Sequence, residues 1–257
     1  MYVYLYDNFL RQNRYESALK SIETKLTDYG IAGKIIRLQN FTNAEWVIED
    51  EIRKGAKTVI IVGNDTTFGH VLSRGASCQV LFGFIPIGLD NSIAEVLGIP
   101  AGVEAADVLA KRRVVKLDVG WFNNRYFVSK LYIPPSFISV EYDERFKVES
   151  STKKMELVVC NLQPFHWKRS SGRGSKEYIV HPQDGKLEAF LRPVLKKTLL
   201  RRERLEDPSI FPFEEMVVKG NTPFEVQADG KISKETKITI KLAKKRIQMI
   251  VGKGRRF

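Results

Sequence analysis

The sequence predicts an α/β protein: an N-terminal parallel-sheet domain followed by a second domain that is β-rich and mostly antiparallel. Two observations lead to this prediction. Short apolar runs alternate with helix-periodic segments up to about residue 113, whereas nearly all later segments have strand patterns. The charge also divides: residues 1–120 hold 14 Lys and Arg against 14 Asp and Glu, whereas residues 121–257 hold 28 against 16. We therefore expect domains at 1–113 and 114–257, and a return of the C-terminus to the first domain stays open.

The first half reads as strands alternating with helices, which is typical of a parallel sheet with helices on both faces. Gly30 is placed to end the first helix in a left-handed conformation. Thr42 and Glu45 have the spacing of a capping box at the start of the second helix. The expected strands are 2–6, 34–38, 58–62 and 80–87, and the expected helices are 15–29, 44–55, a segment around 68–72, and 91–97.

The second half is predicted to be built mainly of antiparallel strands. Phe122-Asn123-Asn124 has the composition of a hairpin turn between two strands. Residues 187–205 carry apolar side chains at helical spacing and basic residues elsewhere, so we expect one substantial helix there. The expected strands are 114–119, 125–132, 155–162, 178–181, 216–219, 224–228, 238–242 and 246–251.

A polar turn follows the most strongly apolar strand of the first half, at Gly63-Asn64-Asp65-Thr66-Thr67. Open α/β sheets bind ligands at the carboxyl ends of their strands. Backbone N–H groups in such a turn can hold a phosphate, and an adjacent carboxylate can hold a metal ion. Asp65 is therefore a candidate metal ligand, unless it serves only to cap the helix that begins near Thr66.

A second polar turn lies about twenty residues further on, in Ile85-Pro86-Ile87-Gly88-Leu89-Asp90-Asn91-Ser92-Ile93-Ala94-Glu95-Val96-Leu97-Gly98-Ile99-Pro100. Two later segments are Lys116-Leu117-Asp118-Val119-Gly120 and Val226-Gln227-Ala228-Asp229-Gly230, and His181-Pro182-Gln183-Asp184-Gly185 lies between them. In this order and spacing, the segments resemble the catalytic domain of the diacylglycerol and sphingosine kinase family, which includes bacterial lipid kinases.

The resemblance implies a first domain of the phosphofructokinase/NAD-kinase type and ATP-dependent phosphoryl transfer to a lipid hydroxyl, with ATP and Mg²⁺ as cofactors. It implies that Asp65 helps to hold the metal ion and that Asp229 takes the proton of the acceptor hydroxyl. Read from the residues alone, Asp229 is equally the first residue of a type I′ Asp-Gly turn. The residues implied to line the nucleotide are Gly63, Asn64, Asp65, Thr66, Thr67, Gly88 and Asn91.

The motifs depart from the family pattern at several positions. Asn64 and Thr66 replace two glycines, and a β-branched residue such as Thr66 tolerates a left-handed backbone poorly. Leu89 replaces a threonine, Asp90 replaces a glycine, and Ser92 and Lys231 replace acidic residues. These replacements also favour a catalytically silent binding or regulatory module with the same fold.

An NAD-kinase-like enzyme and a nucleic-acid binder are each consistent with part of the sequence. An NAD-kinase-like enzyme would share the first turn, but Leu97-Gly98-Ile99-Pro100 fits the lipid kinases better. A nucleic-acid binder could use the basic second half, but the sequence lacks a motif of aromatic residues on a basic strand face, so nucleic acid is an unlikely partner.

Composition gives expectations about location and membrane contact. No apolar stretch approaches the ~20 residues of a membrane span. The N-terminus lacks the features of a signal peptide, and two distant cysteines suit a reducing, cytoplasmic setting. The basic second half could contact an anionic membrane lipid surface as a peripheral protein, or it could be a solvated shell.

Overall fold

The computed structural model describes residues 1–39, 44–143, 146–150, 152–169, 174–195 and 204–257. The chain forms two compact units. The first unit consists of Met1–Leu117 and Lys245–Phe257, and the second consists of Asp118–Lys244. The capping box predicted at Thr42 lies outside the described residues.

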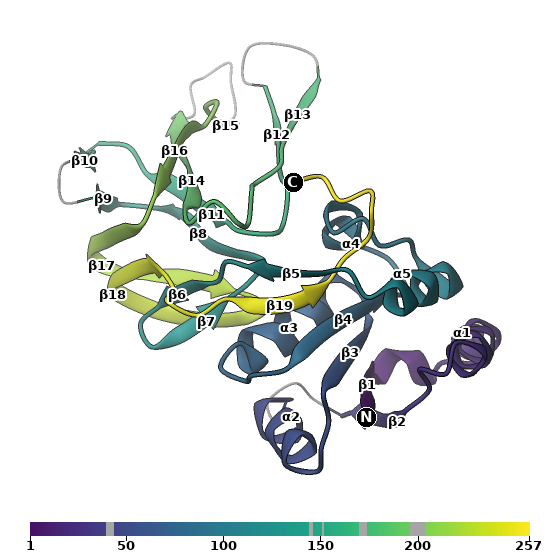
Figure 1. The fold of residues 1–257 in the computed structure, drawn as a ribbon. Helices are drawn as coiled ribbons and strands as arrows, with labels where there is room; N and C mark the ends of the chain where they lie inside the picture. The colour runs from purple at the N-terminus through teal and green to yellow at the C-terminus, as the bar shows by residue number, and fades with distance from the viewer. Residues whose placement is uncertain (40–43, 144–145, 151, 170–173, 196–203) are drawn as a thin grey trace. The chain divides into compact units, whose positions relative to one another are not determined.

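The first unit contains a six-stranded sheet in the order β2-β1-β3-β4-β19-β5. All neighbouring strands in it are parallel except β5, which runs antiparallel to β19. Helices α2 and α3 pack on one face, and α1 and α5 pack on the other (Figure 1). Its strands are β1 (Tyr2–Asp7), β2 (Lys34–Leu38), β3 (Thr58–Gly63), β4 (Leu81–Pro86), β5 (Val114–Leu117) and β19 (Ile247–Ile250); its helices are α1 (Glu16–Asp28), α2 (Ala44–Arg53), α3 (Asp65–Gly75), α4 (Ser92–Val96) and α5 (Ala105–Lys111), with 3₁₀ turns η1 (Asn8–Arg11), η2 (Asn13–Tyr15) and η3 (Gly102–Glu104).

The central strands of this sheet are buried along their whole length, as their continuous apolar runs predict. Every residue of β3 and of β4 is buried, because helices cover both faces of the sheet. The alternation of strands and helices that the sequence predicted in this half is therefore present in the structure. Gly30 has φ +65°, which is the left-handed conformation expected after α1.

The C-terminal strand belongs to the first sheet. Strand β19 inserts between β4 and β5, parallel to the first and antiparallel to the second. Residues 245–257 therefore fold with the first unit, and the two units meet along the chain at residues 117/118 and 244/245. Strand periodicity predicted β19 itself, but a local pattern carries no information about which sheet a strand joins.

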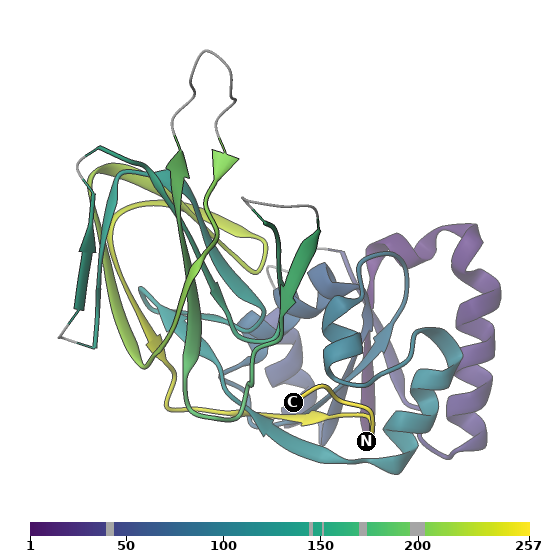
Figure 2. The ribbon, with the colours of Figure 1, turned by 90° about the horizontal axis from the view of Figure 1, so that it is seen from above.

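The second unit is built on one large antiparallel sheet of eleven strands. Its main path runs β15-β14-β11-β8-β17-β18-β6-β7, with β16 paired to β14, β9 paired to β17, and β10 paired to β9. A separate hairpin consists of β12 and β13, as seen from above in Figure 2. The strands are β6 (Gly120–Phe122), β7 (Arg125–Phe127), β8 (Lys130–Ser136), β9 (Ile138–Tyr142), β10 (Phe146–Glu149), β11 (Met155–Cys160), β12 (Phe165–Lys168), β13 (Ser175–Tyr178), β14 (Leu187–Leu195), β15 (Arg204–Leu205), β16 (Ser209–Phe213), β17 (Glu215–Ala228) and β18 (Lys231–Leu242).

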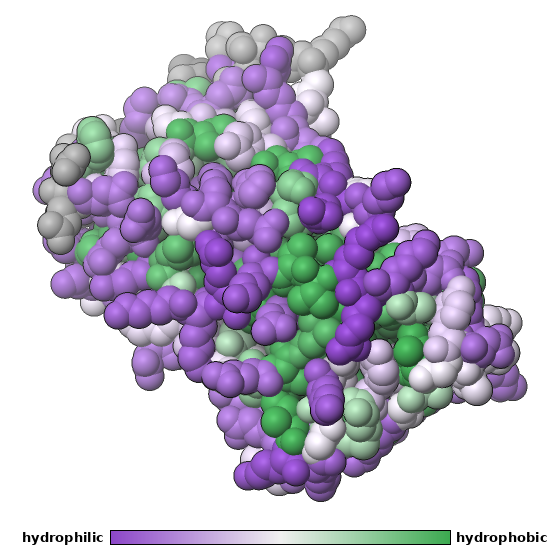
Figure 3. Space-filling model, viewed as in Figure 1, coloured by the Kyte–Doolittle hydropathy of each residue, from purple (hydrophilic) through white to green (hydrophobic). Residues whose placement is uncertain are grey.

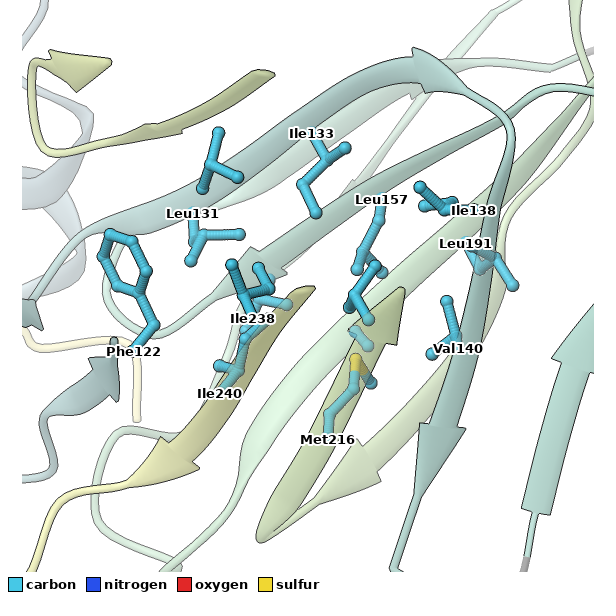
Figure 4. Close-up of a cluster of buried hydrophobic side chains, with 14 of the residues drawn as sticks. Phe122, Leu131, Ile133, Ile138, Val140, Leu157, Leu191, Met216, Ile238 and Ile240 are labelled. Atoms are coloured by element: carbon cyan, nitrogen blue, oxygen red, sulfur yellow. The ribbon is translucent and has the colours of Figure 1, made fainter. Parts of the chain in front are cut away.

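The core of this unit is formed by alternate residues of its strands. Leu131 and Ile133 of β8 meet Leu157 of β11 and Ile238 and Ile240 of β18 in one cluster (Figure 4). Side chains two residues apart share a face of a strand, so this alternation places the apolar side chains inside. Full burial of each such side chain contributes about 1.5–3 kcal/mol to folding.

The helix predicted over 187–205 is wrong. Residues 187–195 form strand β14, residues 204 and 205 form β15, and residues 196–203 lie outside the described part of the chain. Leu187, Ala189 and Leu191 face the main core, whereas Phe190 faces a second apolar cluster. A strand buried on both faces has apolar residues at every spacing, so helical spacing occurs in it by coincidence.

The predicted hairpin at Phe122-Asn123-Asn124 is present. Strands β6 and β7 pair antiparallel, with Phe122 opposite Arg125. Asn123 and Asn124 both have positive φ, at 39° and 65°, as a type I′ turn requires.

In the described part of the chain, no helix has both the length and the apolar character needed to cross a membrane. Hydrophilic side chains cover much of the face shown in Figure 3.

Candidate functional site

Three strands of the first unit end beside one another at the same edge of the sheet. Strands β1, β3 and β4 are neighbours and parallel, and they end at Asp7, Gly63 and Pro86. The N–H of Ile87 donates to the carbonyl of Gly63 at 2.7 Å, so β3 and β4 stay joined to their ends. Residues 63–67, called the first turn below, and residues 88–92, called the second turn, both begin at this edge, where α/β sheets bind ligands.

The first turn is fixed by a reciprocal cap. Oδ1 of Asn64 accepts from the N–H of Thr67 at 3.1 Å, and Oγ1 of Thr67 accepts from the N–H of Asn64 at 3.2 Å. The Thr67 hydroxyl also donates to Oδ2 of Asp7 at 2.5 Å, which ties the turn to the end of β1. A Cβ on Gly63 would lie 2.4 Å from Oγ1 of Thr67, so glycine is required there for close approach.

The replacement of two family glycines does not strain this turn, contrary to our expectation for Thr66. Asn64 has φ −111°, and no residue of the first turn has positive φ. Thr66 is the second residue of α3 and is exposed. The backbone of this chain therefore reaches α3 without the left-handed conformation that glycine permits.

The Asp65 carboxylate joins the first turn to the second. Its Oδ2 accepts from the hydroxyl of Ser92 at 2.7 Å, and both oxygens accept from the N–H of Ile93, at 3.2 and 3.1 Å. The N–H of Asp65 donates to the carbonyl of Asp90 at 2.9 Å. Asp65 therefore caps α4, whereas Asn64 caps α3. Burial raises the pKa of Asp65, and the hydrogen bonds from Ser92 and Ile93 oppose that rise.

The surroundings of Asp65 do not fit a metal ion held by protein ligands alone. Its side chain is 8% exposed and both oxygens already accept hydrogen bonds. Among the described residues, no group of three or more His, Cys, Asp or Glu side chains could hold a metal ion. Within the described part of the chain, Oδ1 accepts only the bond from Ile93, so it keeps a lone pair that could bind a metal ion carried by a nucleotide.

The second turn keeps two left-handed positions. Gly88 has φ 95°, and Asp90, in place of a family glycine, has φ 63°. The Asn91 amide donates to the carbonyl of Gly88 at 2.9 Å and closes the turn, while its buried Oδ1 has no hydrogen-bond partner among the residues that the structure describes. Leu89 at the tip is 82% exposed. Asp is among the residues that tolerate the left-handed region, so the turn conformation survives the replacement.

A cavity of about 420 Å³ lies beyond the end of β1 in the first unit, a size typical of small-ligand pockets. Arg11 and Arg37 bring positive charge to its wall, where Lys20 is paired with Glu16 at 2.8 Å and Glu23 adds a negative charge. Arg37 also lies over the Tyr6 ring. No motif marked these residues in the sequence, because they come from separate segments. The full lining is Leu10, Arg11, Gln12, Asn13, Glu16, Leu19, Lys20, Glu23 and Arg37.

Asp229 lies in the second unit, in the two-residue turn between β17 and β18. Asp229 and Gly230 have φ 42° and 76°, as in a type I′ turn. The carboxylate accepts from the N–H of Val128 at 2.6 Å and of Ser129 at 3.2 Å, and the Ser129 hydroxyl also donates to it. Burial raises the pKa of Asp229 to about 6, although these hydrogen bonds lower it. Asp229 therefore forms the type I′ turn that the sequence allowed. Its raised pKa would also suit a group that accepts a proton.

A buried polar cluster in the same unit brings together other family-like segments. Oδ2 of Asp118 accepts from the N–H of Gly185 at 2.9 Å. The Asn161 amide donates to the carbonyls of Asp118 and Val128, which links this cluster to the residues that hold Asp229. Glu188 is buried nearby, and desolvation, followed by the charge of Asp184, raises its pKa to about 8. Sequence reasoning missed Asn161 and Glu188, which stand in ordinary strand patterns.

The predicted nucleotide-lining residues thus share one edge of the first unit, whereas Asp229 belongs to the second. Gly63, Asn64, Asp65 and Thr67 contact one another or the second turn directly. Thr66 is exposed at the start of α3.

Comparisons with known proteins support the resemblance over the first half of the chain, which contains the two turns. Residues 4–122 match the family model of the diacylglycerol kinase catalytic domain. Diacylglycerol kinase of Staphylococcus carnosus (strain TM300) is 25% identical over 118 residues, which are 45% of this chain and 39% of that protein. Diacylglycerol kinase of Staphylococcus aureus (strain bovine RF122 / ET3-1) is 25% identical over 149 residues, covering 57% and 47%. The matched part therefore spans less than half the length of these relatives.

Solved structures show the same fold over nearly the whole chain. A crystal structure of a diacylglycerol kinase from Bacillus anthracis str. Sterne covers 98% of this chain and 97% of its own, with TM-score 0.76 at 18% identity. A further structure from the same strain has TM-score 0.74, also at 18% identity. The predicted fold class is confirmed, and the family resemblance is confirmed for residues 4–122. In general terms, this kinase family uses ATP and a divalent metal ion.

Proposed function

We propose, from the diacylglycerol kinase catalytic domain over residues 4–122, that this chain is an ATP-dependent lipid kinase that phosphorylates the hydroxyl of a membrane lipid. The observation that carries the proposal is the contact of Asp65 with Ser92 and Ile93. It holds together the two turns that the family motifs mark as lining the nucleotide. Phosphoryl transfer depends mainly on positioning, so joined and rigid turns favour it.

The edge of the first unit offers complementary chemistry to a nucleotide. Arg11 and Arg37 supply positive charge in the neighbouring cavity, whereas the N–H groups of Asp65 and Thr67 at the start of α3 already donate to Asp90 and Asn64. The exposed second turn would line the nucleotide through Gly88 and Asn91. Asp90 adds a negative charge there, which weakens phosphate binding.

Asp229 would act as the base. In the proposed step, the lipid hydroxyl oxygen forms a bond to the γ-phosphorus, the bond to the β-phosphate bridge oxygen breaks, and ADP leaves. The hydroxyl proton passes to the Asp229 carboxylate. A pKa near 6 lets this carboxylate be ionised at neutral pH while remaining a stronger base than an ordinary aspartate.

Phosphate transfer from labelled ATP tests the proposal directly. Diacylglycerol, sphingosine and NAD are offered in parallel to the wild type and to Asp229→Asn, with magnesium present and absent. The proposal predicts labelled diacylglycerol or sphingosine with the wild type, and at least a hundredfold less with Asp229→Asn, in line with the loss of a general base. Labelling of NAD alone, or equal lipid labelling by the variant, would contradict it.

A second candidate is a catalytically silent binding module with the same fold. One observation favours it: the carboxylates of both Asp65 and Asp229 already accept hydrogen bonds within the protein. Thermal unfolding with millimolar ATP separates nucleotide binding from its loss, because a ligand that binds only the folded state raises the melting temperature. ATP stabilisation without any phosphate transfer would favour the silent module.

A further inference from the structure

Helix α4 begins at the last residue of the second turn and is too short to be stable on its own. It has five residues, Ser92–Val96, and isolated helices shorter than ~12–15 residues are marginal in water. Its conformation must therefore come from tertiary contacts, which are the burial of Ile93, Ala94 and Val96 and the hydrogen bonds at its two ends. Asp65 supplies those at the N-terminal end.

The C-terminal end of α4 is held by the segment that follows β19. The N–H of Gly252 donates to the carbonyl of Leu97 at 2.9 Å, and the N–H of Arg256 donates to the carbonyl of Val96 at 2.9 Å. These carbonyls stand at the end of the helix, where no later turn can satisfy them. All of these residues belong to the first unit.

Two glycines allow the close approach. Gly98 has φ 68°, and a Cβ there would lie 2.4 Å from the backbone nitrogen of Arg255. A Cβ on Gly252 would lie 1.7 Å from the carbonyl oxygen of Gly98. Neither contact could be relieved by rotating a side chain, because both partners are backbone atoms.

We propose that residues 251–256 are a strap that positions α4 and, through it, the second turn for nucleotide binding. The strap would not contact the nucleotide. It would affect nucleotide binding only by fixing the C-terminal end of α4, whose N-terminal end is held by Asp65. The effect of the strap on ATP binding rests on the proposed function. Its effect on the stability of α4 does not depend on any ligand.

A matched pair of variants at Arg256 tests the strap. Arg256→Pro removes the N–H that binds the Val96 carbonyl, whereas Arg256→Ala removes the side chain and keeps that N–H. Gly252→Ala and Gly254→Ala form a second pair, because a Cβ on Gly254 meets nothing within 4 Å. Should Gly252→Ala fail to fold, the Arg256 pair carries the test alone.

Hydrogen exchange without ligand is the first readout. Arg256→Pro is expected to raise exchange in residues 88–97 by roughly fivefold over Arg256→Ala, the effect of about one hydrogen bond. Equal exchange in the two variants would overturn the strap.

Titration with ATP is the second readout. The Kd of Arg256→Pro is expected to exceed that of Arg256→Ala by a similar factor, because only the proline variant loses the N–H. Faster exchange with an unchanged Kd would overturn the positioning role. Absence of ATP binding in the wild type would contradict the proposed function, and the exchange result would still decide whether the strap holds α4.

Discussion

Asp65 is the residue whose carboxylate joins the first turn to the start of α4. Its carboxylate meets a buried N–H at Ile93 and a hydroxyl at Ser92, so one side chain completes a helix that begins almost thirty residues later. The sequence offered a metal ligand or a cap of the next helix as its role. Neither role predicts the contact with Ser92 and Ile93, because these residues follow β4 whereas Asp65 follows β3.

Removal of this carboxylate should destabilise the protein. Asp65→Ala leaves the buried N–H of Ile93 without an acceptor, so we expect the free energy of unfolding to fall by about 1–3 kcal/mol. Ser92→Ala should cost about 1 kcal/mol, since only one hydrogen bond is lost. Urea unfolding measures both, with the exposed Thr66→Ala as control. A stability of Asp65→Ala equal to that of Thr66→Ala would refute the capping role.

Glu188 should make stability depend on pH. Its folded pKa of about 8 lies above the ordinary value of 4.5, so the folded state binds the proton more tightly than the unfolded state. The stability that this group contributes below pH 4.5 is therefore lost as pH rises toward 8. Glu188→Gln cannot ionise, so its stability should fall less over this range and exceed that of the wild type at pH 8.

Urea unfolding at several pH values between 4 and 8 checks this difference, with exposed Glu149→Gln as the control that keeps the wild-type slope. Parallel pH profiles for the wild type and Glu188→Gln would show that the carboxyl is not perturbed by burial.

Among the elements, the second turn shows how a motif can change residues and keep its backbone. Asp90 occupies the left-handed position of a family glycine, so conformation is retained while negative charge is added. Asp90→Asn removes the charge and still tolerates positive φ. We expect the Kd for ATP to fall about fivefold, because a charge about 4 Å from a phosphate costs ~1 kcal/mol in water.

Calorimetric titration of ATP into Asp90→Asn provides the value, and Asp28→Asn on α1 is the matched control. If the two variants bind ATP equally, Asp90 does not face the nucleotide.

Helices and strands could be predicted from the sequence where the spacing of apolar residues matches the burial of the element in the structure. The strands ending at Gly63 and Pro86 are buried on both faces, and their apolar runs identified them. The segment 187–195 failed for the same physical reason: with both faces of β14 buried, its apolar residues fit helical spacing as well as strand spacing. The pairing of β19 with β4 and β5 could not be derived, because sheet order depends on long-range contacts.

At the scale of the whole molecule, the net charge and the two turns belong to different parts of the chain. The formal net charge of +12 arises wholly within residues 121–257, while the turns proposed to line the nucleotide lie in the neutral part. The positions of Gly63, Asp65 and Gly88 at the ends of neighbouring strands could be predicted from motif order. The cavity around Arg11 and Arg37 could not, since it is assembled from short segments that carry no motif.

The basic part of the chain should bind anionic membranes by charge. We expect cosedimentation with vesicles of anionic phospholipid, and loss of most binding between about 0.05 and 0.5 M NaCl as the charges are screened. Vesicles of zwitterionic lipid are the control. Equal binding to both kinds of vesicle would argue against an electrostatic contact.

The central claim is that the edge formed by the ends of β1, β3 and β4 binds ATP. Isothermal titration of ATP into the wild type, Asn91→Ala and the exposed control Asn221→Ala tests it most directly. We predict saturable binding at one site, several-fold weaker in Asn91→Ala because the second turn loses its bond to Gly88, and unchanged in Asn221→Ala. No saturable heat with the wild type, or equal affinities for all three proteins, would contradict the account.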